Sequence, residues 1–190
     1  MAPGTTTRRL AIFLVVAAGG LALDLWTKDY MFRRLGPPAP PPQGRTEWVI
    51  PGYFGWQTSL NEGALFGMGQ GLTSLFAAAA AAAAAVIFYW LFVVGAAADR
   101  LLNFALAGVM GGVLGNLYDR LGWWWTRDFE GYPRHAVRDW ILLQYGRWVW
   151  PNFNVADMLL VGGAGLLMFH AWRMPAAEQP STSGERPPVV

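Results

Sequence analysis

The chain has 190 residues, 54% of them hydrophobic and only 14% charged, and its formal net charge is +2. A soluble domain usually carries about 25% charged residues, so this composition favours a membrane protein; the small net charge, with no Lys/Arg cluster, argues against a nucleic-acid partner. The chain has no Cys, which excludes disulfides, thiol nucleophiles and thiolate metal sites.

Four stretches contain enough apolar residues, roughly 20 each, to cross a bilayer core as a helix. They lie at about residues 8–30, 72–98, 101–121 and 153–173. Arg8 and Arg9 precede the first stretch, which could therefore be a cleaved signal peptide. We expect it to be retained, because its apolar pattern runs on into a charged segment and three more spans follow. The sequence thus predicts an all-α integral membrane protein with four transmembrane helices.

The connections between the spans are unequal in length. After the first span, a Pro-rich extended segment at residues 36–43 leads into residues 44–62, where β-prone side chains predict short strands. Residues 122–152, before the fourth span, form a second long connection that is rich in Trp and that we interpret as a loop. We expect residues 1–175 to form a single membrane-embedded domain and the polar tail, residues 176–190, to be disordered.

The distribution of charged residues supports two opposite orientations of the chain in the membrane. Most Lys and Arg residues lie on the side of the two long connections, and simple counting places that side in the cytoplasm. However, acids on the same side match them in number, and the doublet Arg8–Arg9 favours an N-terminus inside. We therefore expect both termini in the cytoplasm.

The conspicuous polar motifs all fall at the span ends that face the long connections. Asp24 and Lys28, four residues apart, share one helix face at the end of the first span. The stretch "NEGALF" approaches the second span, "GNLYDR" ends the third, "VRDW" precedes the fourth and "FNVAD" opens it. Amides and carboxylates that converge on one membrane face predict a polar pocket, and acids within a membrane are candidates for function.

Each motif also has an ordinary structural interpretation. Asp24 with Lys28 fits an interfacial ion pair, and Asp119 beside Arg120 fits a salt bridge at a helix end. Asn154 and Asp157 fit a helix cap, because such side chains satisfy the free N–H groups of a first turn. The two histidines, His135 and His170, lack metal-ligand spacing, so we expect no metal and no cofactor.

In their order and at these span ends, the motifs at residues 24–28, 61–66, 115–120, 137–140 and 153–157 resemble those of the lipoprotein signal peptidase family, also called signal peptidase II. The resemblance covers most of the chain, from about residue 8 to residue 173. It implies a bacterial inner-membrane aspartic endopeptidase that removes the signal peptide from prolipoproteins just before a cysteine already carrying diacylglycerol. It also implies a small extracytoplasmic β-sheet after the first helix and an active site near the extracytoplasmic face.

The resemblance assigns the catalytic pair to Asp139 and Asp157, and gives Asp119 a structural role in holding Arg120. Its substrate-binding or supporting residues correspond to Asp24, Lys28, Asn61, Gly63, Asn116, Arg120 and Asn154. The expected partners are diacylglyceryl prolipoproteins and membrane lipid, and we expect a monomer.

Two insertions depart from the family pattern. Residues 121–138 separate Arg120 from Asp139 by more than the family usually has, which makes Asp128 a competing acid. We prefer Asp139, because the "VRDW" motif and the following Ile141 match. The Pro-rich residues 36–43 are the second insertion.

Two neighbouring carboxyls suit peptide hydrolysis because they cannot both ionise readily and so share a proton. The ionised member takes a proton from water; the protonated member hydrogen-bonds the scissile carbonyl, and the leaving amine is then protonated. The alternative is a small polytopic transporter or assembly factor that uses the same acids for ion or proton transfer. Transporters usually place polar residues near the membrane midplane, whereas here they gather at one face, which favours the protease.

Overall fold

A computed structural model describes residues 3–38, 45–63, 69, 71–125 and 134–173. Its helices are α1 (Pro3–Leu35), α2 (Thr73–Phe88), α3 (Arg100–Arg120) and α4 (Val155–Arg173), and its strands are β1 (Glu47–Ile50), β2 (Phe54–Asn61), β3 (Val137–Tyr145) and β4 (Trp148–Phe153). The competing acid Asp128, most of the Pro-rich segment and the tail lie outside the described residues.

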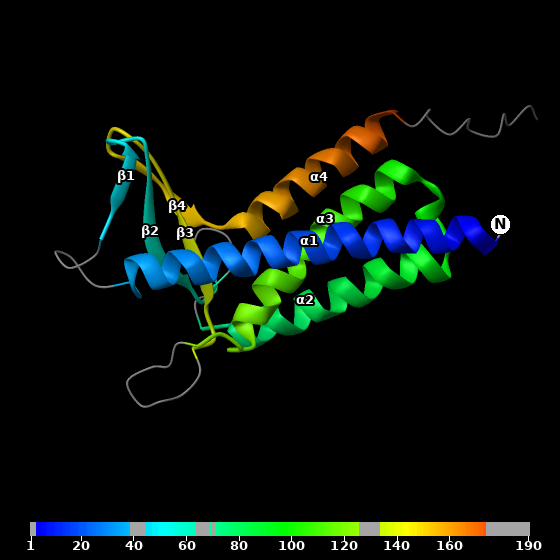
Figure 1. The fold of residues 1–190 in the computed structure, drawn as a ribbon, viewed down its shortest axis with the longest axis horizontal. Coiled ribbons are helices and arrows are strands. Elements are labelled where there is room, and N and C mark those ends of the chain that lie inside the picture. Colours follow the sequence, from blue (N-terminus) through cyan, green and yellow to red (C-terminus); the bar gives the residue numbers. More distant parts are fainter. Residues whose placement is uncertain (1–2, 39–44, 64–68, 70, 126–133, 174–190) are drawn as a thin grey trace, which may run out of the picture.

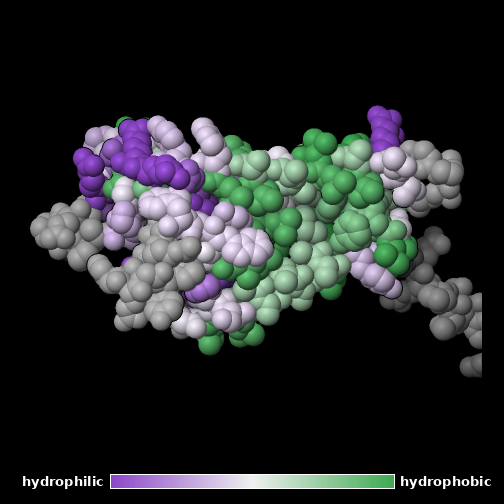
Figure 2. All heavy atoms as spheres, turned by 60° about the horizontal axis from the view of Figure 1, so that its bottom comes forward, coloured by the Kyte–Doolittle hydropathy of each residue, from purple (hydrophilic) through white to green (hydrophobic). Residues whose placement is uncertain are grey.

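Within the described residues, four helical segments are long and apolar enough to cross a membrane, as the sequence predicts. They span Thr6–Leu35, Thr73–Val93, Arg100–Arg120 and Val155–Arg173. The helices form a bundle with the sheet at one end, while the N-terminus and the end of α4 lie at the other (Figure 1). On the face shown in Figure 2, hydrophobic residues cover the helical part and hydrophilic residues gather at the sheet end, as expected of a lipid-embedded bundle with a polar cap.

Helix α3 is the centre of the bundle, and α1, α2 and α4 all pack against it. Glycines allow the close approach of two of these neighbours. A methyl group on Gly111 would lie 2.9 Å from the carbonyl oxygen of Ala17 in α1, and one on Gly112 would lie 2.5 Å from that of Ala156 in α4. The Gly-rich sequence of α3 therefore sets how closely the site-bearing ends of α1 and α4 can meet.

The second span changes its helical form before the turn into α3. Helix α2 continues as a π-helix at Tyr89–Val93, and a 3-10 turn follows at Ala96–Ala98. Between them, Gly95 adopts a φ of 91°, a conformation that glycine reaches without strain. Asp99 then caps α3, and its Oδ2 lies 2.6 Å from Nε2 of His170, which joins the end of α4 to the start of α3.

The four strands form one antiparallel sheet in the order β1-β2-β3-β4. Strands β1 and β2 come from the connection in which strands are predicted. Strands β3 and β4 come from residues 122–152, so the expectation of a loop is wrong for these two segments. Their Trp residues serve as strand residues, because aromatic side chains fit a half-buried sheet, and Gly146 supplies the positive φ of the turn between them.

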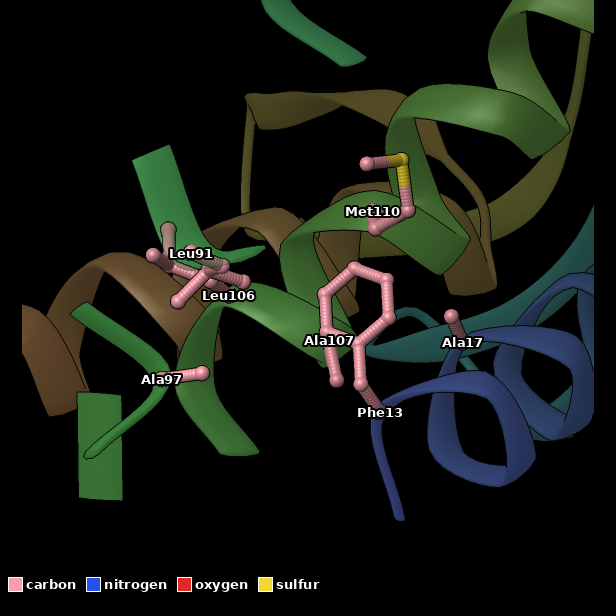
Figure 3. Packing of buried hydrophobic residues seen from close by; sticks show 7 residues of the cluster. All are labelled: Phe13, Ala17, Leu91, Ala97, Leu106, Ala107 and Met110. Carbon is pink, nitrogen blue, oxygen red and sulfur yellow. The ribbon is translucent and has the colours of Figure 1, made fainter. Parts of the chain in front are cut away.

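Two hydrophobic clusters lie along α1, on either side of its polar residues Asp24 and Lys28. The first fills the half of the bundle nearer the N-terminus (Figure 3) and comprises Phe13, Ala17, Leu91, Ala97, Leu106, Ala107 and Met110. The second joins the end of α1 to the sheet and comprises Met31, Phe32, Leu35, Trp124, Trp140 and Ile141. The second cluster thus fixes the sheet over the end of the bundle.

Candidate active site

The sequence-predicted site residues meet where the bundle joins the sheet. Helix α1 contributes two of them, the end of β2 one, the end of α3 two, β3 one, the residue before α4 one and the first turn of α4 one; Gly63 lies two residues after β2. In that order they are Asp24, Lys28, Asn61, Asn116, Arg120, Asp139, Asn154 and Asp157.

The start of α4 is held by a reciprocal cap. The backbone N–H of Asp157 donates to Oδ1 of Asn154 at 3.0 Å, and the backbone N–H of Asn154 donates to Oδ2 of Asp157 at 3.1 Å. Such a cap satisfies free backbone donors and favours a negative charge at a helix N-terminus. The capping interpretation of these two residues is therefore correct, and it also fixes the position of the Asp157 carboxylate.

Asn154 also connects this cap to Asp139 on β3. Its side-chain Nδ2 donates to Oδ1 of Asp139 at 2.6 Å, and both side chains are buried. A strand presents successive side chains to opposite faces, so the position of Asp139 on β3 decides that its carboxyl faces α4. One amide residue thus contacts both acids of the expected pair.

Burial gives Asp139 an unusual protonation equilibrium. Its removal from water, together with the negative charge of Asp157, raises the pKa of Asp139 to about 8. The positive charge of Lys28 and hydrogen bonds from the side chains of Asn154 and Asn61 oppose this rise but are outweighed. Asp139 therefore holds a proton at neutral pH.

Asn116 of α3 links the acids to the charges beneath them. Its Nδ2 donates to Oδ1 of Asp157 at 3.0 Å, and its Oδ1 accepts hydrogen bonds from Nζ of Lys28 at 2.9 Å and from Nδ2 of Asn154 at 3.2 Å. Because one end of the amide is occupied by a cation and the other by a carboxylate, its orientation is fixed.

Lys28 is the centre of a buried ion cluster. Its Nζ lies 2.7 Å from Oδ2 of Asp24 and 3.1 Å from Oδ2 of Asp119, and all three side chains have no exposed surface. The Asp24–Lys28 pair expected from helical spacing is present. Asp24 also accepts a hydrogen bond at 2.8 Å from the backbone N–H of Ala156 in α4. Buried charges of this kind depend on each other, since removing one leaves another uncompensated.

Asp119 does not hold Arg120, contrary to expectation. Adjacent residues on a helix do not face each other, so the two side chains diverge. Asp119 instead receives two hydrogen bonds from the Arg138 guanidinium, at 3.0 and 2.7 Å, in addition to its pair with Lys28. Arg120 donates through Nη2 to the carbonyl oxygen of Gly63 at 3.1 Å. The partner of Asp119 lies far along the chain, and no local spacing indicates it.

Gly63 enters the site through its backbone. Its carbonyl accepts from Arg120, and its N–H donates to Oδ1 of Asn61 at 3.0 Å. The residue thus holds Asn61 close to the end of α3. Sequence reasoning names all of these residues but misses Arg138 and the backbone N–H of Ala156, whose roles depend on contacts between distant elements.

The sequence of this chain is similar to those of known signal peptidases. The family model for signal peptidase (SPase) II matches residues 16–173. A lipoprotein signal peptidase of Rhodopirellula baltica is 45% identical over 165 residues, covering 86% of this chain and 73% of that protein. One of Xanthomonas axonopodis pv. citri is 32% identical over 181 residues, covering 92% of this chain and 94% of the other.

The fold also has a solved counterpart. A bacterial membrane enzyme, whose structure was determined by the in meso method, matches with a TM-score of 0.67 and 22% identity, covering 100% of this chain and 96% of the other. The family resemblance of the five motifs is therefore confirmed by the match over most of the sequence: the chain belongs to the signal peptidase II family.

Proposed function

We propose that the chain is an aspartic endopeptidase whose catalytic pair is Asp139 and Asp157. The observation that carries this proposal is the position of Asn154, which donates to Asp139 through its side chain and to Asp157 through its backbone. Two acids bonded to one residue lie close together, and the charge of one raises the pKa of the other. Such a pair can carry out water-based peptide hydrolysis, with one acid ionised and the other protonated.

The hydrogen bonds support a division of roles between the two acids. Asp157 accepts N–H donors at both of its oxygens, a pattern that suits an ionised carboxylate acting as general base. Asp139, protonated at neutral pH, suits the general acid. Water attacks the scissile carbonyl carbon and gives a proton to Asp157, while Asp139 hydrogen-bonds the carbonyl oxygen. Asp157 then gives the proton that it took from water to the amide nitrogen, the C–N bond breaks and the amine leaves.

Family membership supports prolipoproteins as substrates, cleaved before a cysteine that carries diacylglycerol. Such a substrate has an apolar signal helix and acyl chains, so its scissile bond lies at the membrane surface. The site at the junction of bundle and sheet suits that location. The basic residues at the opposite end, Arg8, Arg9, Arg100 and Arg173, favour cytoplasmic termini in a bacterial inner membrane and an extracytoplasmic site.

Substitution of each acid by its amide tests the catalytic pair. We expect Asp139→Asn and Asp157→Asn each to lower the cleavage rate by about 100-fold or more, because neither amide can exchange the required proton. The measurement is mass spectrometry of a diacylglyceryl prolipoprotein incubated with purified protein, in which the expected product begins with the lipidated cysteine.

Asp29→Asn is the matched control. Asp29 lies at the same end of α1 as the site, but it bonds Arg33 and Trp125 rather than the pair, so we expect wild-type cleavage. If folded Asp139→Asn or Asp157→Asn protein cleaves at the control rate, the assignment of these acids as the catalytic pair is wrong. A role in transport or assembly then becomes the better hypothesis. The apolar cluster that fills the other half of the bundle speaks against a transport path (Figure 3).

A further inference from the structure

Arg138, the residue before Asp139, carries a buried charge that the proposed reaction does not use. Its side chain is only 2% exposed. The guanidinium Nε and Nη2 both donate to Oδ1 of Asp119, at 3.0 and 2.7 Å, and the indole ring of Trp124 lies 5.1 Å from its Cζ. A buried cation with a carboxylate on one side and an aromatic face on another is held in a single position.

Among the described residues, no strand pairs with β3 on its β4 side at Arg138 and Asp139. Strand β2 pairs with β3 along one edge, opposite both residues, whereas β4 pairs with β3 from Ile141 to Tyr145. The backbone N–H of Arg138 donates at 3.0 Å to Oδ2 of Asp119 instead of to a strand. The Asp119 carboxylate therefore accepts the hydrogen bond that a neighbouring strand would otherwise accept. It bonds both the backbone and the side chain of Arg138.

The ion pair of Arg138 with Asp119 also balances charge close to Asp139 and Asp157. Asp119 lies between two cations, Lys28 and Arg138. Lys28 in turn bonds Asn116, which bonds Asp157. Without Arg138, Lys28 alone would compensate Asp119, and the negative charge near Asp139 would be greater.

We propose that Arg138 is a positioning residue for Asp139: locked to Asp119, it fixes the strand that carries the acid and neutralises the carboxylate behind it. This inference rests on the proposed function. It predicts both a loss of turnover and a displaced pH dependence when Arg138 is replaced.

The sign of that displacement follows from the charges around Asp139. Asp157 of α4, Lys28 of α1 and Arg120 of α3 act on it directly. Asp24 and Asp119 pair with Lys28, and Arg138 of β3 pairs with Asp119. Loss of the Arg138 charge leaves the set more negative, so Asp139 holds its proton more tightly and its pKa rises further. The alkaline limb of the rate profile should therefore move to higher pH.

Three variants separate positioning from simple stability. In Arg138→Met we expect kcat to fall by about tenfold or more with KM within about twofold, and the alkaline limb to rise by about half a pH unit or more. Arg138→Lys keeps the positive charge but not the two guanidinium hydrogen bonds to Asp119. The alkaline limb should therefore lie at its wild-type pH, while kcat recovers only in part. In the double variant Asp119→Asn with Arg138→Met, the alkaline limb should lie at its wild-type pH, because one negative and one positive charge have both been removed. Its kcat should stay low, because the hydrogen bonds between the two residues are lost.

The readouts are kcat, KM and the pH profile with a lipidated prolipoprotein peptide, on protein that elutes as the wild type in the same detergent. Wild-type kcat in folded Arg138→Met, or a limb that stays fixed in every variant, would overturn the inference. If Arg138→Met does not fold, Arg138→Lys decides: reduced kcat at unchanged KM supports positioning, and wild-type kcat overturns it. Failure of the wild type to cleave the peptide would instead overturn the proposed function.

Discussion

Asp139 is a carboxylic acid that stays protonated at neutral pH, because it is buried on β3 and lies close to the charge of Asp157. Its neighbours Asn154 and Asn61 supply amide donors, and Asn154 bonds it at 2.6 Å. The same residue type at Asp29, partly exposed and bonded to Arg33, has no such environment. Burial and one charged neighbour therefore separate the proposed general acid from an ordinary surface acid.

The raised pKa predicts how the rate depends on pH. If Asp139 donates the proton, kcat should hold steady near neutrality and fall as pH rises through about 8, since the deprotonated acid can no longer assist the carbonyl or the leaving amine. Single-turnover cleavage of a lipidated peptide between pH 6 and 10 measures this on purified protein. A rate that climbs steadily across that interval would contradict the assignment of Asp139 as the acid.

At the scale of elements, local patterns could be predicted and distant pairings could not. The Asp24–Lys28 pair follows from the helical spacing of four residues, and the cap of α4 follows from Asn and Asp at the start of an apolar span. Strand β3 lacks the alternation of apolar and polar residues that indicates a half-buried strand, because residues 137–142 are all buried. Its contact with Asp119 spans an insertion, and the sequence alone offers no pattern that identifies such a partner.

The glycines of α3 give a test of helix packing at the site. A methyl group on Gly115 would collide with the carboxylate of Asp24, which also holds the backbone N–H of Ala156 at the start of α4. We expect Gly115→Ala to lower the free energy of unfolding by roughly 1–3 kcal/mol and to slow cleavage, because Asp24 and the start of α4 must shift. Thermal unfolding and cleavage in one detergent measure both effects.

Gly108→Ala is the control on the same helix. A methyl group there meets no atom within 4 Å, and alanine favours a helix over glycine. We expect its stability to equal or exceed that of the wild type. Equal losses in both variants would indicate that the collision with Asp24 is not the cause.

At the scale of the whole molecule, the bundle has one end where Arg8, Arg9, Arg100 and Arg173 have few acids beside them, and a polar end capped by the sheet. The described N-terminus and the end of α4 share the first, and the site residues share the second (Figure 1). This asymmetry, together with four apolar spans, is the architecture that a surface-acting membrane enzyme needs. It also makes orientation measurable, since the chain lacks Cys and a single one can be introduced.

Cysteine labelling should place the sheet outside and the N-terminus inside. We expect Tyr145→Cys, at an exposed position at the end of β3, to react with a membrane-impermeant maleimide in intact spheroplasts. Thr6→Cys, exposed in the first turns of α1, should react only after permeabilisation. The reverse pattern would place the site in the cytoplasm and contradict the proposed orientation.

The pairing of β2 with β3 joins segments that a ribosome produces far apart in time, with α2 and α3 between them. Until the fourth span emerges, Asp157 has not been made and β3 has no β4 beside it. The proposed pair of acids therefore forms only after the first three helices have been made. If Asp139 and Asp157 form the proposed pair, cleavage requires translation through residue 157, and chains that stop after the third span lack one of the two acids.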